Sequence, residues 1–542
     1  MPTIMLAGRF RRTNHSLLTL RLKRHNVFVS PTFNRFIDAV AVGTNPGMAE
    51  GRALKAQIPV IGPRGLDALL NGADINHVIW NAIEQPQRPL ASSTVLAQLR
   101  SILHNAPTEE IWHQIVGLLD RTPSQELEIA VQYAKAHMEH WPLATAPKPS
   151  YYEPPNDICW SLPWPQMDLL GRPTLSWLRG LALDRVDRRF ELLRAIDFRH
   201  LPATIRAANT LEMVLRHPSL TGLRALFLRS YDVDGSHADS FAQSTSPIEL
   251  LIYQGNTGIS EAVLRTWLEG GLPHLRRLDL HLHQLSVPRR PLRPFRPLEA
   301  FCAGPSLRPD TLDIYAHVLS STQHISALHS GFQGGPQVRK LVRALNPEVL
   351  KSLDLSHIVV GRRGTEALLE QRWPQLRHLR LRNSNLSTRA GEYFHRMARL
   401  PQLEGLDLHG NALYQRGVVG ISQAELPALK WLNLSSCLRS ADLLWLCNPA
   451  LASLKGLGLA HNAIDACSVI RILATRPERA AHLEVLDLRG SSSEERRIVD
   501  TLVQHRQALP NLRRIGLSLR HRPISPTSIR LLRDAFPQLT PF

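Results

Sequence analysis

From about residue 190 onward, the hydrophobic positions of the chain recur in a six-residue pattern, L-x-x-L-x-L. The copies from Leu350 onward lie 25 to 29 residues apart, and Ile248 with weaker copies near Leu298 and Ile325 fills wider gaps nearer the amino end. The clearest copies begin at Leu223, Leu275, Leu350, Leu376, Leu403, Leu429, Leu454, Leu483 and Leu512. Self-similarity at this period predicts about thirteen structural repeats between about residues 175 and 530.

Each repeat combines two spacings of apolar residues. Leucines three and then two residues apart predict a short strand whose leucines point into the core, because alternate residues of a strand face the same way. In the second half of a repeat, for example TRAGEYFHRMARL, apolar residues lie three and four apart, as in an amphipathic helix. A strand and a helix in every repeat predict an α/β solenoid, a horseshoe with its helices outside, whose repeats stabilise one another in a row.

The ninth position of the pattern holds Asn256, Asn411, Cys437 and Asn462. The repeats therefore read L-x-x-L-x-L-x-x-N/C-x-L and resemble the leucine-rich-repeat family, with repeats of the ribonuclease-inhibitor-like type. The resemblance implies that these side chains hydrogen-bond the turning backbone inside the coil. Ser384 and Ser491 occupy the same position in other repeats, so we expect the internal ladder to be imperfect.

Function in such a solenoid is expected at the strand positions between the leucines, on the concave face. These positions hold aspartates flanked by cations, and we predict a protein-binding face formed by Asp279, His281, Asp354, Arg380, Arg382, Asp407, His409, Asp487 and Arg489. One interpretation is that neighbouring repeats only neutralise each other through weak surface ion pairs. The other is a binding surface for a protein of mixed charge. A row of carboxylates is poorly suited to nucleic-acid phosphates, which argues against nucleic acid on this face.

Residues 1–72 do not repeat, and their pattern alternates short apolar strands with helices, which predicts a small parallel α/β sheet. The segment IDAVAVGTNPGMAEGRALKAQIPVIGPRGLDALL, together with IMLAGRF near the start, resembles the BRCT domain of NAD-dependent bacterial DNA ligases. Two features depart from that family. Ala7 stands where a Thr or Ser commonly precedes the glycine of the first turn, and His25 and Asn26 replace the usual Gly-Gly.

The BRCT resemblance implies a phosphate site in which the hydroxyl of the first turn is missing. Independently, residues 1–72 carry ten Lys and Arg against three acids, a net charge of +7, and several of these cations lie in or just before the first helix. That charge is either a solvated helix face or a contact surface for phosphates, whose strength would fall steeply with salt. The candidate phosphate or DNA-binding residues are Gly8, Arg9, Arg11, Arg12, Arg21, Arg24, Arg52 and Lys55.

Between these regions, residues 73–145 predict a helical linker or cap for the solenoid, in which Thr108 and Ser124 are expected at helix starts with acids following them. Residues 146–175 form a Pro- and Trp-rich stretch that we expect to be an extended connector. The solenoid is assigned to residues 176–542.

Composition excludes several classes of protein. Hydrophobic residues at 43% and charged residues at 20% are typical of a globular chain. The five cysteines are scattered without a CxxC pair, so neither a disulfide framework nor a zinc site is expected, and a cytoplasmic location fits best. The net charge of +18 is mostly arginine and says little about partners. We expect no signal peptide and no membrane-spanning segment.

Motifs of catalysis are missing from the sequence. It contains no HExxH, no P-loop and no GxSxG, and His281 with His283 would bind a metal only if a third ligand converged. We therefore expect no enzyme, no cofactor, no metal and no small-molecule substrate. The sequence predicts a non-catalytic adaptor that holds a protein on the repeats and docks on a phosphorylated protein or DNA through the BRCT-like domain. The alternative is a DNA-associated factor whose small domain grips DNA while the repeats recruit a repair or replication protein.

Overall fold

The computed structural model divides the chain into two compact units, which are described separately: residues 1–145 with 167–275, and residues 146–166 with 276–542. The structure describes residues 2–8, 10, 14–33, 37–43, 49, 52–53, 58–75, 77–78, 92–105, 107–139, 141, 144–145, 168–169, 173, 175–182, 186–198, 210–229, 233–255, 259–282, 290–303, 307, 309, 311–327, 334–397, 399–438, 443–517 and 524–541.

A small parallel sheet begins the first unit, as the sequence predicts. Its strand order is β2-β1-β3-β4, and every neighbouring pair is parallel. The elements are β1 (Thr3–Ala7), α1 (His15–Arg24), β2 (Phe28–Ser30), β3 (Ala39–Val42), β4 (Val60–Ile61) and α3 (Pro63–Leu70). Of the further helix expected between β3 and β4, residues 49, 52 and 53 are described, and they are helical.

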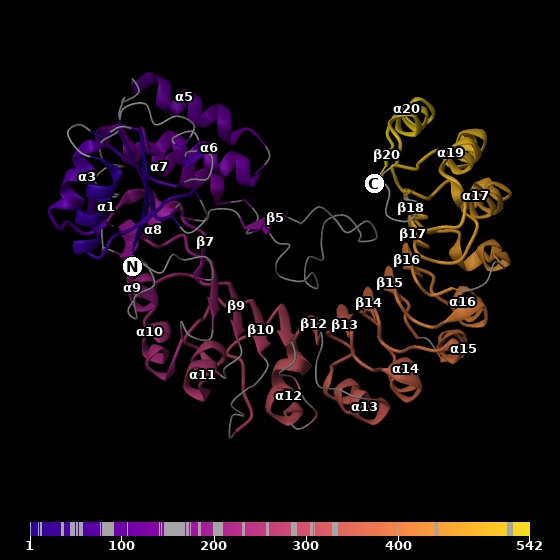
Figure 1. Cartoon of the computed structure of the whole chain (residues 1–542). Helices are drawn as coiled ribbons and strands as arrows, with labels where there is room; N and C mark the ends of the chain where they lie inside the picture. Colours follow the sequence, from indigo (N-terminus) through magenta and orange to yellow (C-terminus); the bar gives the residue numbers. More distant parts are fainter. Residues whose placement is uncertain are drawn as a thin grey trace. The chain divides into compact units, whose positions relative to one another are not determined.

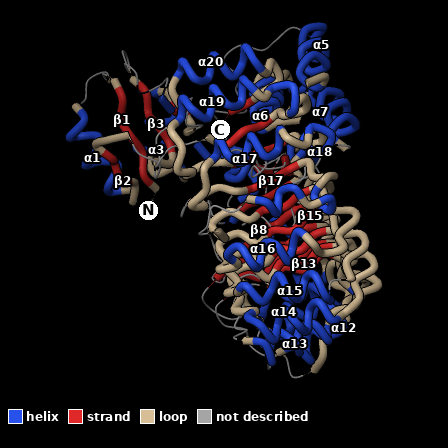
Figure 2. Tube along the Cα trace, turned by 90° about the vertical axis from the view of Figure 1, so that its right-hand side faces the viewer, coloured by secondary structure: helices blue, strands red, loops and turns tan. Residues whose placement is uncertain are grey.

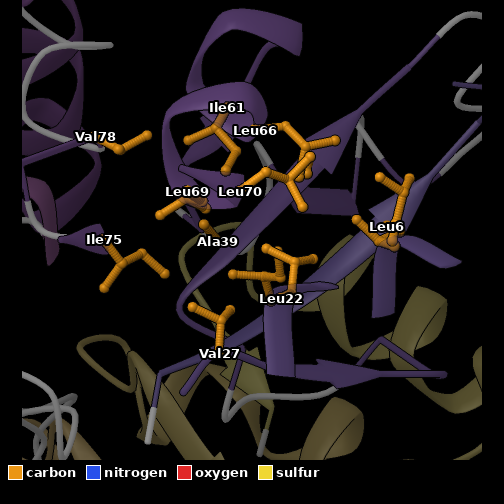
Figure 3. Close-up of a cluster of buried hydrophobic side chains, with 13 residues drawn as sticks. Leu6, Leu22, Val27, Ala39, Ile61, Leu66, Leu69, Leu70, Ile75 and Val78 are labelled. Atoms are coloured by element: carbon orange, nitrogen blue, oxygen red, sulfur yellow. The ribbon is translucent and has the colours of Figure 1, made fainter. Parts of the chain in front are cut away.

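Helix α1 is fixed at its start and along one side. The side chain of Asn14 accepts a hydrogen bond of 2.8 Å from the backbone N–H of Leu17, which satisfies a donor that the first helical turn leaves unpaired. Leu18 and Leu22, four residues apart and therefore on one side of the helix, are buried in the core under β1 and β3. Figure 3 shows Leu22 in this core with Leu6 and side chains of α3. Truncating such a buried leucine to alanine costs about 2–5 kcal/mol.

Three helices follow, as predicted: α5 (Ser92–Leu103), α6 (Glu109–Leu119) and α7 (Ser124–Met138). Thr108 caps α6, since its hydroxyl oxygen accepts a hydrogen bond of 3.2 Å from the N–H of Ile111. Helix α7 begins at Ser124 as expected, but the residue at the cap position is Pro123 and no side chain caps the helix. Most of the connector predicted over residues 146–175 lies outside the described residues.

The repeats of the first unit continue from α8 (Leu175–Ala182) and the 3-10 helix η3 (Arg188–Leu192). They supply β7 (Ala195–Asp197), α9 (Thr210–Arg216), β8 (Ala225–Arg229), α10 (Ala238–Ala242), β9 (Leu250–Gly255) and α11 (Glu261–Glu269). Strands β7, β8 and β9 pair in parallel, with Ile196 opposite Leu226 and Leu226 opposite Leu251.

The second unit is a longer run of the same repeat. Its strands are β10 (Arg277–Leu282), β11 (Ala300–Ala303), β12 (His324–Ser326), β13 (Ser352–Asp354), β14 (His378–Arg380), β15 (Gly405–Asp407), β16 (Trp431–Asn433), β17 (Gly456–Gly458), β18 (Val485–Asp487), β19 (Arg514–Gly516) and β20 (Thr540–Pro541). Its helices include α12 (Leu312–Ser321), α13 (Gly335–Ala344), α14 (Gly361–Glu370), α15 (Thr388–Met397), α16 (Tyr414–Ser422), α17 (Ala466–Ala474), α18 (Pro477–Ala480), α19 (Glu495–Gln504) and α20 (Pro526–Ala535).

All neighbouring strands of this unit are parallel and in step, so that leucines of equal rank lie side by side, such as Leu353 with Leu379 and Leu406 with Leu432. The helices lie along one side of the strands and leave the other strand face uncovered (Figure 1). Figure 2 shows α13, α14, α15 and α16 following one another along the row. The α/β leucine-rich-repeat solenoid predicted from the sequence is therefore confirmed.

The weak repeat near Ile325 forms a regular strand, β12, but Ile325 is not the first residue of its pattern. Ile325 pairs with Leu353, so it takes the place of the second leucine of the pattern, and Thr322 stands where the first leucine is expected. Thr322 is buried, and its hydroxyl donates a 2.6 Å hydrogen bond to the carbonyl of Val318. A threonine is accepted in this core position because the preceding helix supplies a partner for its hydroxyl.

The internal ladder expected at the ninth position is present where it is described. The Asn411 amide donates to the carbonyls of Leu381 (2.6 Å) and Leu408 (2.7 Å) and accepts from the N–H groups of Ser384 and Leu386. Asn462 makes the equivalent four contacts in the next-but-one repeat. Cys437 occupies this position with its thiol donating to the carbonyl of Leu408 at 3.0 Å, and Asn256 lies outside the described residues.

Among the helices that the structure describes, none is long and apolar enough to cross a bilayer.

Candidate protein-binding face

The candidate residues of the solenoid lie on the uncovered strand face of the second unit, here called the inner face. Sequence reasoning expects the aspartates there to be exposed, and this expectation is wrong. Asp279, Asp354, Asp407 and Asp487 are only 0–8% exposed. Parallel strands lie about 4.8 Å apart, so short side chains at equal positions are covered by the longer ones beside them.

At the ends of the strands, three of the aspartates accept the same type of hydrogen bond from the backbone two residues ahead. An oxygen of Asp354 accepts a hydrogen bond from the N–H of Ser356 (2.9 Å), Asp407 accepts from His409 (3.1 Å), and Asp487 accepts from Arg489 (3.0 Å). Asn433 makes the same contact with the N–H of Ser435 at 3.0 Å. The position therefore requires an acceptor that reaches two residues ahead, which both Asp and Asn supply.

Three of these carboxylates are also held by arginines. Arg277 pairs with Asp279 and Arg489 with Asp487, each at 2.7 Å and within one repeat, while Arg382 pairs with Asp407 of the next repeat. The guanidinium groups of Arg382 and Arg489 remain 27% and 29% exposed above carboxylates that are 11% and 0% exposed. The ion pairs expected from the sequence thus exist. Arg277 and Asp279 are both buried, whereas the pairs of Arg382 and Arg489 bury the carboxylate and leave the guanidinium group partly exposed.

Asp354 and Arg380 lie opposite each other on adjacent strands. Burial raises the pKa of Asp354, and the nearby charge of Arg380 with the hydrogen bond from Ser356 opposes that rise. Arg380 itself is buried, so this pair belongs to the interior of the face and offers little to a partner. His281, at the end of β10, is half-buried.

A group of cations and imidazoles lies where the strands end. It consists of His357, Arg382, His409, His461 and Arg489, and we call it the cationic rim. Backbone hydrogen bonds link adjacent members. The N–H of His357 donates to the carbonyl oxygen of Arg382 at 2.7 Å, and the N–H of His461 donates to the carbonyl oxygen of Arg489 at 2.6 Å. Burial lowers the pKa of His409 below its ordinary value; Asp407 opposes this, and Arg382, His461 and His357 add to it. His357 and His461 are exposed.

At the beginning of some strands, the end opposite to the cationic rim, large side chains of the inner face lie against glycines of the following repeat. A methyl group on Gly456 would overlap the ring of Trp431, and one on Gly405 would lie 2.8 Å from Nδ1 of His378. Burial, with the neighbouring charge of Arg380, lowers the pKa of His378 to about 3, and burial with Lys351 lowers that of His324 to about 4. Both imidazoles are therefore neutral packing groups at neutral pH.

The structure separates the candidate phosphate residues of the small domain. Gly8 follows β1 with a positive φ of 89°, and its carbonyl contacts Nε2 of His15 at the start of α1. Arg21 and Arg24 are exposed in the last turn of α1, a helix about 15 Å long, so they lie toward the end of the sheet where β2 begins. Arg52 is exposed, and Arg9, Arg11, Arg12 and Lys55 lie outside the described residues. Gly8 thus does not share one site with Arg21 and Arg24.

A second row of charges was missed in the sequence analysis. It occupies the second position of the pattern, where acids of some repeats pair with cations of the neighbouring ones, although Lys430 and Lys455 are like-charged neighbours. The pairs are Arg224–Glu249 (3.4 Å), Arg276–Glu299 (2.7 Å), Arg377–Glu404 (3.7 Å), Lys430–Glu404 (3.0 Å) and Lys455–Glu484 (3.1 Å). Aligning the repeats and noting the sign at this position would have found the row.

Other chemistry on the solenoid is structural. Burial raises the pKa of the Cys437 thiol to about 12, which keeps it protonated inside the ladder. In the part of the chain that the structure describes, no three His, Cys, Asp or Glu side chains gather as a metal site. His283, the second member of the predicted histidine pair, is outside that part.

No protein-family model and no curated protein matches this sequence. Solved structures to which the chain is similar include an internalin, inlF, of Listeria monocytogenes, at 14% identity over 56% of this chain and 82% of that chain, with a TM-score of 0.33. A chain of the yeast Rad7 and Elc1 complex is 12% identical over 83% of this chain and 94% of that one, with a TM-score of 0.35. A chain of the TLR13–ssRNA13 complex is 15% identical over 62% of this chain and 56% of that one, with a TM-score of 0.33. The solenoid assignment rests on the strands and ladder contacts of this chain.

Proposed function

We propose that the protein is a non-catalytic adaptor whose cationic rim binds an acidic segment of a partner protein. The observation that carries this proposal is the burial of Asp407 and Asp487 beneath arginines, which leaves the guanidinium groups of Arg382 and Arg489 as the partly exposed charges of the rim. The sequence expectation of a mixed-charge partner is therefore replaced by that of an acidic one.

The geometry favours binding for an energetic reason. Arg382 and Arg489 are already oriented by Asp407 and Asp487, so a partner would lose less side-chain entropy in ordering them. A guanidinium group that meets a carboxylate forms charge-assisted hydrogen bonds, which are among the stronger polar contacts in interfaces. The sequence argued against nucleic acid on this face because exposed carboxylates would repel phosphates. Since the carboxylates are buried, that argument no longer holds, and the experiment must distinguish an acidic protein segment from a nucleic acid.

Selection of peptides from a random displayed library on the full-length chain tests the proposal. We expect enrichment of Asp and Glu, and at least about a tenfold loss of affinity in Arg382→Glu measured by fluorescence anisotropy. Arg396→Glu, an exposed arginine in the last turn of α15, is the matched control and should bind like the wild type. Peptides without acidic enrichment, or equal binding by Arg382→Glu, would reject an acidic partner on the rim.

For the small domain we propose a BRCT-like docking module, supported by the agreement between the predicted and observed order of strands and helices. The alternative function, a DNA-associated factor, is favoured by one feature, the exposed Arg21, Lys23 and Arg24 on a helix without any acidic residue.

Binding of 5′-phosphorylated duplex DNA by the full-length chain, followed over a salt series, decides between the two. The DNA-associated function predicts a negative log–log salt slope that becomes shallower in Arg21→Glu and Arg24→Glu. If the chain binds no DNA near physiological salt, the DNA-associated function is rejected, and docking on a protein remains the proposed role of the small domain.

A further inference from the structure

The chain between β10 and β11 contains a three-residue repeat that the leucine pattern does not explain. Residues 290–298 read RPLRPFRPL, so an arginine, a proline and an apolar residue each return at every third place. We call these nine residues the triplet segment. The described residues 290–299 form no helix, whereas the next repeat has α12 between its strands. Nothing in the proposed adaptor function uses the triplet segment.

Proline chemistry restricts the backbone of the triplet segment. A proline holds its own φ near −65°, and the residue before a proline is held in an extended conformation. Three prolines and the three arginines before them are restricted in this way. In the structure residues 291–294 form neither helix nor strand, no residue of the segment has a positive φ, and the chain bends at Phe295 and Arg296. Residues 290–294 are thus suited to a polyproline II helix, in which every third residue lies on the same edge.

The apolar positions of the triplet segment attach it to the solenoid. Leu292 and Leu298 are 0% and 2% exposed. The backbone N–H of Leu292 donates a 2.9 Å hydrogen bond to the carbonyl of Ile314, in the first turn of α12. The segment is therefore held on its leucine side against the solenoid.

The arginine and proline positions face the other way. The exposed residues among them are Arg290, Pro291, Arg293, Arg296 and Pro297, and Pro294 is half-buried. Because a polyproline II helix has three residues per turn, the same kind of side chain returns about every 9 Å along an edge. The solenoid thus presents one row of proline rings and one row of guanidinium groups.

The remaining apolar position adds an aromatic ring to this surface. Phe295 is 60% exposed, although the leucines at the equivalent positions are buried. The guanidinium group of Arg296 lies over its ring, 5.9 Å from the centroid. An exposed phenylalanine among exposed prolines forms an apolar surface of the kind that partner proteins cover.

The charge around the triplet segment is positive. It contains three arginines and no acid. The following residue, Glu299, pairs with Arg276 at 2.7 Å. Asp313, next to Ile314 on α12, is exposed and is the acid to set against the three arginines. A net positive charge favours a partner that carries carboxylates.

The row of prolines indicates which kind of partner fits. Proline-rich segments dock in grooves lined by aromatic side chains, and they lose little conformational entropy because their conformation exists before binding. A single-stranded nucleic acid would use the arginines and Phe295, but it would leave the prolines without a partner. The prolines therefore favour a protein over a nucleic acid.

We propose that the triplet segment is a docking site for a protein domain that has an aromatic-lined groove flanked by carboxylates. The groove takes Pro291, Pro294 and Phe295, and the carboxylates meet Arg290 and Arg293. The triplet segment belongs to a different repeat from the cationic rim, and the proposal does not rest on the function proposed for the rim.

Titration calorimetry of the full-length chain with a panel of purified SH3, WW and EVH1 domains tests the site, since these domains have aromatic-lined grooves. We expect saturable binding of at least one domain at concentrations up to about 1 mM, and no binding when its groove aromatics are changed to alanine. Pro291→Ala and Arg293→Glu should each weaken binding by about tenfold or more. Pro401→Ala, at an exposed proline between α15 and β15, is the matched control and should bind like the wild type.

Three results would overturn the proposal: no saturable binding by any domain of the panel, equal binding by Pro291→Ala, or an equal loss in Pro401→Ala. Should Pro291→Ala fail to fold, Arg293→Glu decides, because Arg293 is exposed and its change leaves the prolines in place. A short oligouridine that binds more tightly than any domain, and that Arg293→Glu releases while Pro291→Ala does not, would assign the segment to nucleic acid instead.

Discussion

At the scale of single residues, the eighth position of the repeats has a conformational requirement that residue type alone does not reveal. In six consecutive repeats it adopts a left-handed backbone, with φ between 49° and 72°. The residues are His357, Asn383, Gly410, Ser436, His461 and Gly490. Side chains other than Gly and Asn adopt this region at a cost of about 1–2 kcal/mol.

Ser436→Gly is therefore expected to stabilise the protein by up to about 1 kcal/mol, since Ser436 is exposed and its φ is 57°. Gly410→Ala should destabilise it by about 1–3 kcal/mol, because φ is 72° and the new methyl group would overlap the side chain of Asn383. Midpoints of urea unfolding measure both. A stabilised Gly410→Ala would contradict the assigned backbone.

The buried histidines predict how stability changes with pH. The pKa of His378 is about 3 in the folded protein against 6.5 for an ordinary histidine, so between these values only the unfolded chain takes up the proton. This contribution is complete above pH 6.5 and is lost as the pH falls toward 3, at up to about 1.4 kcal/mol per pH unit.

His378→Gln should accordingly flatten the dependence of the unfolding midpoint on pH between about 4 and 6. His274→Gln, at an exposed histidine, should leave the slope as it is in the wild type. Equal slopes in wild type and His378→Gln would mean that His378 is protonated in the folded state.

Residue roles were predictable from the sequence only in part. The ladder residues Asn411, Asn462 and Cys437 were identified, because the repeat pattern places them at a position with one task. The aspartates were placed on the correct face but at the wrong depth. Alternation along a strand tells which side a residue faces, whereas burial depends on side chains from neighbouring repeats.

At the scale of elements, glycines set how closely the helices of consecutive repeats approach. Gly391 of α15 lies against the backbone of α16, and a methyl group there would overlap the carbonyl of Gly417. The helices themselves were predicted from their spacing of apolar residues. The close contact between consecutive helices was not predicted, because the sequence alone does not show which residues a glycine within a helix will contact.

Gly391→Val should destabilise the protein by about 1–3 kcal/mol or more, because the backbone of α16 cannot move aside without disturbing its own repeat. Gly117→Ala in α6 is the control, since nothing lies within 4 Å of the added methyl group. That change should instead stabilise the helix by up to about 1 kcal/mol. Equal effects of the two changes on the thermal midpoint would show that α15 and α16 are not in close contact.

Register is the other property of elements that the sequence left uncertain. The repeat at β12 was located near Ile325, yet its first position is Thr322. A polar residue at an otherwise leucine position hides the start of a repeat, and only the pairing with β13 reveals it.

At the scale of the whole molecule, the architecture was largely predictable because it is repetitive. One pattern recurs often enough to specify both a strand and a helix for each repeat, and the small parallel sheet follows from alternating elements over residues 1–72. Binding properties were less predictable, since they depend on which charges the neighbours of each repeat cover. The cationic character of the rim emerges only when the ion pairs are seen in three dimensions.

The central claim, that the rim binds acidic segments, is tested most directly by a charge exchange. The best acidic peptide selected on the full-length chain is measured by anisotropy against wild type and Arg382→Glu, and each of its acids is changed in turn to lysine. The account predicts that one lysine variant of the peptide binds wild type at least about tenfold more weakly and regains affinity for Arg382→Glu. If, for every acid of the peptide, the losses of binding free energy from the lysine change and from Arg382→Glu simply add, with no recovery of affinity, a direct contact with Arg382 would be contradicted.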